Sequence, residues 1–450
     1  MIAALTNLLA FVVAISVLVA VHEFGHYIVG RWRGMKVLRF SIGFGRPVWT
    51  RVAGKDRTEY CLSAIPLGGY VKFLDGREGP VAAADQGRAF DHRPIPSRIA
   101  VLLAGPLFNF LFAVIAYWAL FVNGVPTVRP AVGVVQEGSY AAQAGLQFGD
   151  RILKVGERPA TDWETALVSI LDEMVGSGKV PLQLEGEDGW VRTTVIDVGD
   201  DAARLTEPGL LFEGLGFTPW QPPAVIGSLD PSGAAQAGGL QEGDRIVGID
   251  GEPVNSFADL QRSVSARPDQ QVSINVLRAG TPQTFELQLG GRDRDGVRSG
   301  FLGVGVSTAV RDYWYVRQYG PVAAVGEALQ RTWTSTAFTV RMFGRMITGD
   351  VSIRNISGPI NIAQFAGDSA ARGWPDFLNF LALISISLGV INLLPIPILD
   401  GGQIVYQAVE LVKGSPLSER SQLLGQQFGI LALLLLMSFA FYNDIARLLS

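Results

Sequence analysis

Four long apolar runs constrain the fold of this chain more than any other feature of its sequence. They cover residues 2–21, 99–122, 378–394 and 428–442, and few polar residues interrupt them. A helix needs about 20 apolar residues to cross the roughly 30 Å hydrocarbon core of a bilayer, and the runs come close to that length. With 48% hydrophobic residues in 450, the chain is too apolar for soluble domains alone. We therefore predict an α-helical integral membrane protein with about four transmembrane helices.

The charges near these runs predict their orientation. Residues 31–98 contain thirteen Lys and Arg but six acidic side chains, and no basic side chain precedes the first run. Because Lys and Arg accumulate in cytoplasmic loops, this segment should be cytoplasmic, with residues 123–377 and both termini outside. The missing basic flank and the length of the first run argue against a cleaved signal peptide. A net charge of −4 gives no indication of nucleic-acid binding.

The segment between the second and third runs contains a repeat. The stretches "AAQAGLQFGDRILKVGERP" and "AAQAGGLQEGDRIVGIDGEP" place Asp150 and Asp244 in the same Gly-Asp turn, 94 residues apart. Each copy predicts a strand and then a helix, and residues 273–290 predict a hairpin. The copies resemble bacterial PDZ domains, which implies two inserted α+β domains within 128–309. Such a fold can bind an extended peptide by strand addition, but two spacer or shielding domains would fit the sequence equally well.

The sequence "HEFGH" at the end of the first run contains two of the chain's three histidines. His22 and His26 are four residues apart, so a helix places both imidazoles on one face. They can bind one Zn²⁺, and Glu23 between them can take a proton from water at the metal. The alternative is an ordinary helix end with a hydrogen-bonded histidine pair. Ionisable groups at membrane depth are costly and usually functional, which favours the metal site.

A catalytic zinc site needs a third protein ligand. His92 lies in the polar sequence "FDHRPIPSR" and is expected to face solvent. Asp400 lies in "INLLPIPILDGG", where Pro395 and Pro397 break the third helix. The first and third helices cross in the same direction, so their C-terminal ends reach the same side and Asp400 can meet His22. We favour Asp400 as the ligand, although Asp-Gly-Gly is also typical of a turn.

The chain resembles the site-2 protease family of intramembrane zinc metalloproteases, and within it the sigma-E regulator proteases of Gram-negative bacteria. The motifs "HEFGH" and "NLLPIPILDGG" carry the resemblance, together with "RFSIGFGRPVW", "AIPLGGYVKFLDG", "LLAGPLFNFLFA" and "ISGPINIA". The last has Asn361 where close relatives often have Gly. The resemblance implies that His22, His26 and Asp400 are zinc ligands. It implies that Glu23 is the catalytic residue. It also implies that Asn392, Pro395 and Pro397 help to bind substrate.

The resemblance also implies substrates and a location. The substrates would be single-span membrane proteins such as an anti-sigma factor, cut within the bilayer after a first external cleavage, with remnant signal peptides as a second class. The location would be a bacterial inner membrane, with the PDZ domains and both termini periplasmic. Segment 31–98 would form β-hairpin material that approaches the membrane and pairs with an unwound substrate. The alternative functions are a membrane-anchored PDZ scaffold without catalysis, which does not require Glu23, and a metal transporter, which would need more polar residues in the spans.

The predicted organisation follows from these observations. Residues 321–347 predict an amphipathic helix on the outer surface. The lone Cys61 excludes an internal disulfide and is expected in a core. The predicted segments are a first transmembrane helix (1–30), a cytoplasmic loop (31–98), a second helix (99–122), PDZ domains at 128–220 and 221–309, a linker (310–377), a third helix (378–403) and a fourth helix (427–445).

Overall fold

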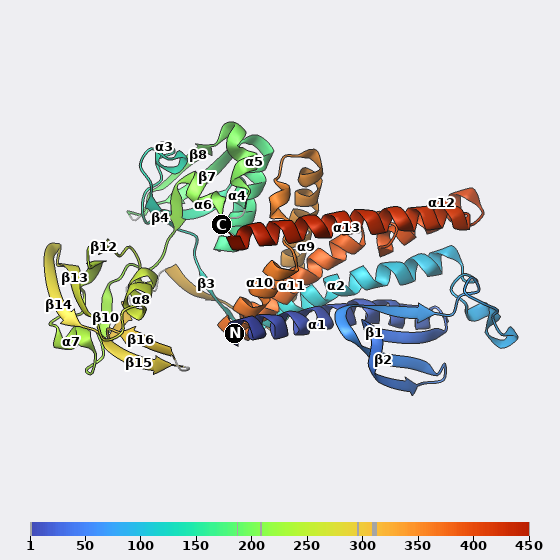
Figure 1. The fold of residues 1–450 in the computed structure, drawn as a ribbon. Coiled ribbons are helices and arrows are strands. Elements are labelled where there is room, and N and C mark those ends of the chain that lie inside the picture. Colours follow the sequence, from blue (N-terminus) through green and yellow to red (C-terminus); the bar gives the residue numbers. More distant parts are fainter. Residues whose placement is uncertain (1, 187, 208, 295–296, 308–312, 450) are drawn as a thin grey trace. The chain divides into compact units, whose positions relative to one another are not determined.

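The fold is known from a computed structural model, which describes residues 2–186, 188–207, 209–294, 297–307 and 313–449 (Figure 1). The chain divides into two compact units. The first comprises Met1–Val125 and Arg317–Ser450, and the second comprises Pro126–Val316. The expected boundary at residues 309 and 310 lies outside the described residues.

The first unit is built from long helices. In the described part of the chain, four helical segments are long and apolar enough to cross a membrane: Leu5–Trp32, Ile95–Asn123, Trp374–Asn392 and Arg420–Arg447. They confirm the predicted number of spans. The helices of this unit are α1 (Ile2–Trp32), α2 (Ile95–Asn123), α9 (Pro321–Thr348), α10 (Pro359–Arg372), α11 (Trp374–Asn392), α12 (Asp400–Lys413) and α13 (Glu419–Leu449), with short 3₁₀ turns η1 (Ala83–Arg88) and η4 (Ile353–Asn355).

Helix α2 lies at the centre of this unit and contacts α1, α9, α11 and α12. Small residues make the close approach possible: Ala113 and Ala116 of α2 are buried against Ala324 and Ala328 of α9 and Ala382 of α11. Small side chains at helix contacts are typical of membrane proteins, in which packing rather than water exclusion holds helices together. The predicted amphipathic helix is present as α9, and it packs on α2 through its alanines.

The third apolar segment differs from the prediction of one helix over 378–403. Helix α11 ends at Asn392, residues 393–399 are irregular, and a separate helix α12 begins at Asp400. Proline lacks a backbone N–H and clashes with the preceding turn, so Pro395 and Pro397 explain the break. The result places Asp400 in the first turn of a new helix.

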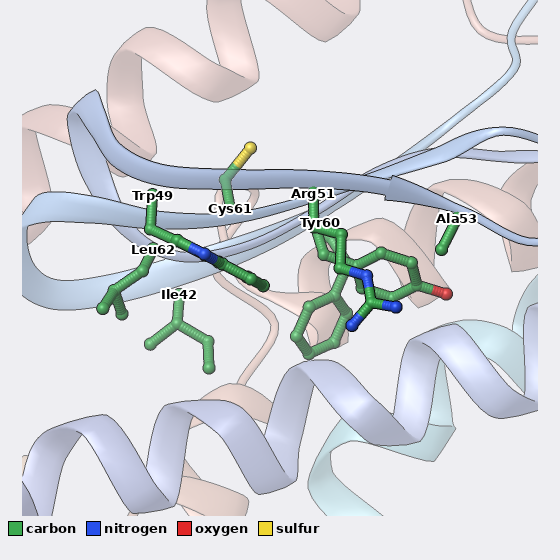
Figure 2. A pocket seen from close by; sticks show the side chains of 8 residues that line it. Ile42, Trp49, Arg51, Ala53, Tyr60, Cys61 and Leu62 are labelled. Atoms are coloured by element: carbon green, nitrogen blue, oxygen red, sulfur yellow. The ribbon is translucent and has the colours of Figure 1, made fainter.

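A long antiparallel hairpin follows α1. Strands β1 (Val37–Ala53) and β2 (Thr58–Phe73) both bend, so that residues 39–42 of β1 lie between residues 59–62 and 69–72 of β2. This confirms the predicted hairpin. One face carries a pocket lined mainly by apolar and aromatic side chains, among them Trp49 and Tyr60, with Arg51 beside Tyr60 (Figure 2). Cys61 is buried, as expected.

The second unit contains the repeat. Its elements are β3 (Val125–Val128), β4 (Val132–Val135), α3 (Tyr140–Gln143), β5 (Arg151–Val155), β6 (Arg158–Pro159), α4 (Trp163–Ser177), β7 (Lys179–Glu185), β8 (Val191–Asp197), η2 (Gly199–Asp201), α5 (Ala202–Leu205), α6 (Leu210–Leu215), β9 (Phe217–Pro219), β10 (Ile226–Leu229), α7 (Ala234–Ala237), β11 (Arg245–Ile249), β12 (Glu252–Pro253), α8 (Phe257–Ser265), β13 (Gln271–Arg278), β14 (Thr281–Gln288), β15 (Gly290–Arg294), β16 (Val297–Phe301), β17 (Val304–Val306) and β18 (Trp314–Arg317).

The two copies fold alike. Their sheets have the orders β6-β5-β7-β8 and β12-β11-β13-β14, and each copy has its own hydrophobic core. The shared turn has a physical reason: Gly149 and Gly243 have φ of +88° and +89°, which favours glycine. The buried carboxylates of Asp150 and Asp244 each accept a hydrogen bond from a backbone N–H of the same turn.

Candidate metal centre

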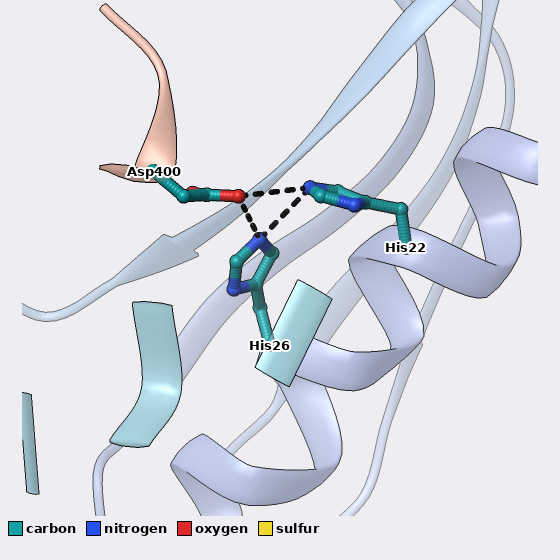
Figure 3. Close-up of side chains that lie close together, drawn as sticks. All are labelled: His22, His26 and Asp400. Carbon is teal, nitrogen blue, oxygen red and sulfur yellow. Dashed lines mark hydrogen bonds and ion pairs between the residues drawn. The ribbon is translucent and has the colours of Figure 1, made fainter. Parts of the chain in front are cut away.

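Three side chains from distant parts of the first unit converge at one point (Figure 3). His22 and His26 project from the same face of α1, and their Nε2 atoms are 3.2 Å apart. The Oδ2 atom of Asp400, at the start of α12, lies 3.1 Å from Nε2 of His22 and 3.4 Å from Nε2 of His26. No other group of three His, Cys, Asp or Glu side chains with this spacing occurs among the described residues.

The contact made by Nδ1 of His26 determines which tautomer of the imidazole is present. Its Nδ1 lies 2.8 Å from the carbonyl oxygen of Val101 in α2, and this contact is buried. A carbonyl only accepts, so Nδ1 carries the hydrogen, and a neutral ring then presents the lone pair of Nε2 to the centre. An imidazole ligand held in this way by a second residue is the usual arrangement in metal sites.

His22 has an equivalent partner in α2. Its Nδ1 lies 3.2 Å from Nδ2 of Asn109, which is fully buried. The Oδ1 atom of Asn109 has no hydrogen-bond partner among the described residues. Oxygen and nitrogen of an amide are assigned from the hydrogen-bond network, and a rotated amide would let Nδ1–H of His22 donate to Oδ1. Both imidazoles then present a lone pair to the same point.

The space for the two rings comes from Gly105 of α2. A Cβ atom at this position would lie 2.3 Å from Nε2 of His26 and 2.7 Å from Cε1 of His22. Contacts below about 3 Å are repulsive, because carbon atoms prefer separations of about 3.5–4.0 Å. Glycine is therefore required for α2 to pack directly against both rings.

This donor set fits a zinc ion. Two imidazole lone pairs and a carboxylate oxygen are all acceptors, and three acceptors within hydrogen-bond distance of one another repel unless a cation or proton lies between them. Tetrahedral ligands 2.0–2.1 Å from zinc are about 3.3 Å apart, and the observed separations of 3.1–3.4 Å agree. His₂-carboxylate with one free position is also a known catalytic zinc set.

Glu23 lies on α1 beside the cluster and is 9% exposed. Segment 69–72 of β2 passes close to its side chain. Gly69 permits this approach, because a Cβ there would lie 3.0 Å from Cγ of Glu23 and 2.7 Å from the carbonyl oxygen of Ser41. The outer segment of the hairpin therefore runs directly past Glu23.

The remaining predicted residues lie as follows. Asn392 is the last residue of α11, and Pro395 and Pro397 lie in the irregular segment that leads to Asp400. His92 is partly exposed, and its imidazole contacts the carbonyl oxygen of Gln86 and lies 3.6 Å from Asp91. It is not part of the cluster, in agreement with the preference for Asp400.

Sequence reasoning missed the contribution of α2. Val101, Gly105 and Asn109 hold or accommodate the imidazoles, and Ser385 of α11 in turn donates a hydrogen bond to the carbonyl oxygen of Asn109, at 2.8 Å. The available signal was the motif "LLAGPLFNF", in which Gly105 and Asn109 interrupt an otherwise apolar run. The motif alone does not indicate which of the two imidazole rings Gly105 or Asn109 contacts.

A His-Glu-x-x-His helix among membrane-crossing helices, with a carboxylate that completes the cluster, defines the class of membrane-embedded metalloproteases. Comparison with known proteins agrees with this class and specifies the family. The model of peptidase family M50 matches residues 10–436, and the chain belongs to this family.

Relatives match over the full length of the chain. RSc1411 of Ralstonia nicotianae, named as a candidate zinc metalloprotease, is 42% identical over 459 residues, with 98% of each chain covered. The regulator of sigma-E protease RseP of Escherichia coli strain K12 is 40% identical over 463 residues, with 100% of each chain covered. The regulator of sigma E protease of Salmonella typhi is 40% identical over 467 residues, again with complete coverage.

Proposed function

We propose that this metalloprotease binds one Zn²⁺ through His22, His26 and Asp400 and hydrolyses peptide bonds within transmembrane segments. The observation that carries the proposal is the convergence of three acceptor atoms at 3.1–3.4 Å beside a buried glutamate. When bound, zinc would polarise the scissile carbonyl as a Lewis acid. Glu23 takes a proton from water, whose oxygen forms a bond to the carbonyl carbon, and gives the proton to the amine nitrogen as the C–N bond breaks.

The hairpin and the segment before α12 support a role in substrate binding. Among the described residues, segment 69–72 pairs with β1 on one side only, so its other edge is available to an extended peptide. Glu23 lies against this segment at Gly69. A peptide bond within a helix is protected by its own hydrogen bonds, so strand addition would expose it to Glu23. Asn392, at the end of α11, and Pro395 and Pro397, in the segment before Asp400, are proposed to help bind the substrate.

The names of the relatives support a substrate class. RseP of E. coli is named a regulator of sigma-E protease, and we infer a comparable role here, with a single-span anti-sigma factor already cut on its outer side as substrate. Remnant signal peptides are a second substrate class. The chain would lie in a bacterial inner membrane with its termini and residues 123–377 in the periplasm, since the positive charges of residues 31–98 favour the cytoplasm.

The two repeated domains of the second unit are proposed to be PDZ domains that restrict access. Neither the three proposed ligands nor Glu23 belongs to this unit, so its role is exclusion or recruitment rather than chemistry. Deletion of residues 128–309 should leave cleavage of a trimmed substrate intact and permit cleavage of an untrimmed one. A deletion variant that inserts in the membrane and retains zinc but cleaves nothing would instead indicate recruitment, for example of a peptide in the PDZ groove.

The substitution Glu23→Gln tests the catalytic proposal against a scaffold without catalysis. Gln keeps the size of the side chain but cannot accept the proton, and general base catalysis typically contributes 10²–10⁴-fold, so cleavage of a model transmembrane substrate should fall by at least this factor. Zinc content should not change, because the ligands are intact. Glu252→Gln, at an exposed acid of the second unit that pairs with Arg267, is the matched control. Activity of Glu23→Gln within a few-fold of wild type would exclude Glu23 from the mechanism and favour the scaffold.

A further inference from the structure

A buried ion pair connects the helix that begins at Asp400 to α2. Nη2 of Arg98 donates to Oε1 of Glu410 at 2.7 Å, and Nη1 donates to Oε2 at 3.1 Å. The side chains are 8% and 15% exposed. Two parallel hydrogen bonds between a guanidinium and a carboxylate fix orientation as well as distance. The residues are 312 positions apart, so the pair joins two segments that share no local structure.

Helix α12 has few other means of staying in place. Its exposed side chains are mainly apolar: Val405, Val409, Leu411 and Val412. Because these side chains are exposed, they make no packing contacts that would hold the helix against the rest of the protein. The buried residues of α12 are Gly401, Gly402 and Gln407, and the partly buried Glu410 follows one turn after Gln407. The position of α12 on α2 therefore depends on specific contacts rather than on hydrophobic burial.

The other end of α12 is held by the irregular segment before it. A Cβ atom at Gly401 would lie 2.3 Å from the carbonyl oxygen of Leu393, and one at Gly402 would lie 2.1 Å from that of Ile396. The Nε2 of Gln403 also donates to the carbonyl oxygen of Pro397, at 2.9 Å. These contacts join the first turn of α12 to its own loop but not to α1, which carries both histidines.

We propose that Arg98 and Glu410 are positioning residues for Asp400: they fix α12 on α2 so that the Asp400 carboxylate reaches both histidines. Glu410 is ten residues after Asp400, about 15 Å along the helix, so a small rotation about the loop would displace the carboxylate unless the far end is fixed. Arg98 is one turn before Val101, which orients His26. Helix α2 thus sets the positions of His26 and Asp400 with one face. This inference rests on the proposed zinc site.

The test measures the metal affinity of the purified full-length protein. Zn²⁺ is titrated against a chelator, and Co²⁺ replaces it for absorption spectra, which report coordination directly. Glu410→Gln removes the charge but keeps the shape, and Arg98→Lys keeps the charge but loses the double hydrogen bond. Residues that orient metal ligands typically contribute 10–100-fold to affinity, so both variants should bind Zn²⁺ at least about 10-fold more weakly. Their Co²⁺ spectra should shift toward that of Asp400→Asn.

Asp244→Asn is the matched control, since Asp244 forms a comparable double hydrogen bond with Arg278 in the second unit. It should bind Zn²⁺ with wild-type affinity. Wild-type affinity and spectra for both Glu410→Gln and Arg98→Lys would overturn the inference, whereas a wild-type protein that binds no Zn²⁺ would overturn the proposed function itself. If neither variant folds while Asp244→Asn does, the pair maintains the fold rather than the position of Asp400, and the inference is wrong.

Discussion

The substitution Gly105→Ala should remove the metal centre without unfolding the protein. Nε2 of His26 would lie 2.3 Å from the new methyl carbon, so relief of the clash requires a shift of about 1 Å to reach ordinary contact. The ring cannot rotate away cheaply, because its Nδ1–H donates to Val101. Metal sites tolerate deviations of about 0.2 Å in ligand distance, which the required shift exceeds several-fold.

We expect Gly105→Ala to weaken zinc binding strongly while it favours the helical conformation of α2. Changes to residues that orient ligands weaken metal binding 10–100-fold, and displacement of a ligand itself should reach the upper end, about 100-fold or about 2.7 kcal/mol. Alanine is favoured over glycine in a helix interior by up to about 1 kcal/mol. Loss of zinc from Gly105→Ala therefore cannot result from a weakened α2.

The assay compares zinc affinity, by competition with a chelator, with cleavage of a model transmembrane substrate. Gly344→Ala in α9 is the control, because beyond the adjacent backbone of the helix no described atom lies within 4 Å of a Cβ at that position. It should leave zinc affinity and activity unchanged. If Gly105→Ala binds Zn²⁺ as tightly as wild type and cleaves at the same rate, α2 does not confine the imidazoles and the reasoning is refuted.

Three further predictions concern the ligands and the fold. His22→Ala should remove most of the zinc measured by elemental analysis, whereas Asp400→Ala should weaken binding; normal zinc in His22→Ala would exclude it as a ligand. The hydrogen bonds from Arg278 lower the pKa of the Asp244 carboxyl. The stability that this ion pair adds to the fold should be complete above about pH 4, the ordinary pKa of Asp. It should disappear as the pH falls through the lowered pKa. Amide exchange of β11 should show this loss in wild type but not in Asp244→Asn. Asp444 of α13 accepts hydrogen bonds from three backbone N–H groups at the start of α10, so Asp444→Ala should lower the free energy of unfolding by about 3 kcal/mol, and an unchanged melting temperature would contradict this.

Much of the fold could be predicted because its signals are local. The four spans follow from apolar length, and the hairpin at 273–290 follows from alternation around Ala279 and Gly280, which have φ of +47° and +82°. Helix α10 was not predicted, although Pro359 at its first position is typical of a helix start. The break at Pro395 and Pro397 was predicted, but the segment given to the third helix, 378–403, was too long, because α11 already ends at Asn392 and Asp400 begins a separate helix.

The cluster of His22, His26 and Asp400, the proposed metal ligands, could be predicted for a different reason. His22 and His26 share a helical face, so their proximity is local, and Asp400 followed from the direction of two helices. The partners of these ligands could not be predicted, because Val101 and Glu410 act through contacts 75 and 312 residues apart in the sequence. A backbone carbonyl such as that of Val101 leaves no trace in the residue type at all.

The residues that support the site share one face of α2. Arg98, Val101, Gly105 and Asn109 follow one another at intervals of three, four and four residues, which places them in one stripe along the helix. Each contributes a different property: a charge that holds α12, a carbonyl that orients one imidazole, a missing side chain that makes room for both, and an amide beside the other. The proposed ligands come from α1 and α12. These two helices are far apart in the sequence and could otherwise shift independently of each other. Because one face of α2 contacts both helices, it fixes their relative position. This explains why α2, which contributes no proposed ligand, carries polar groups on that face.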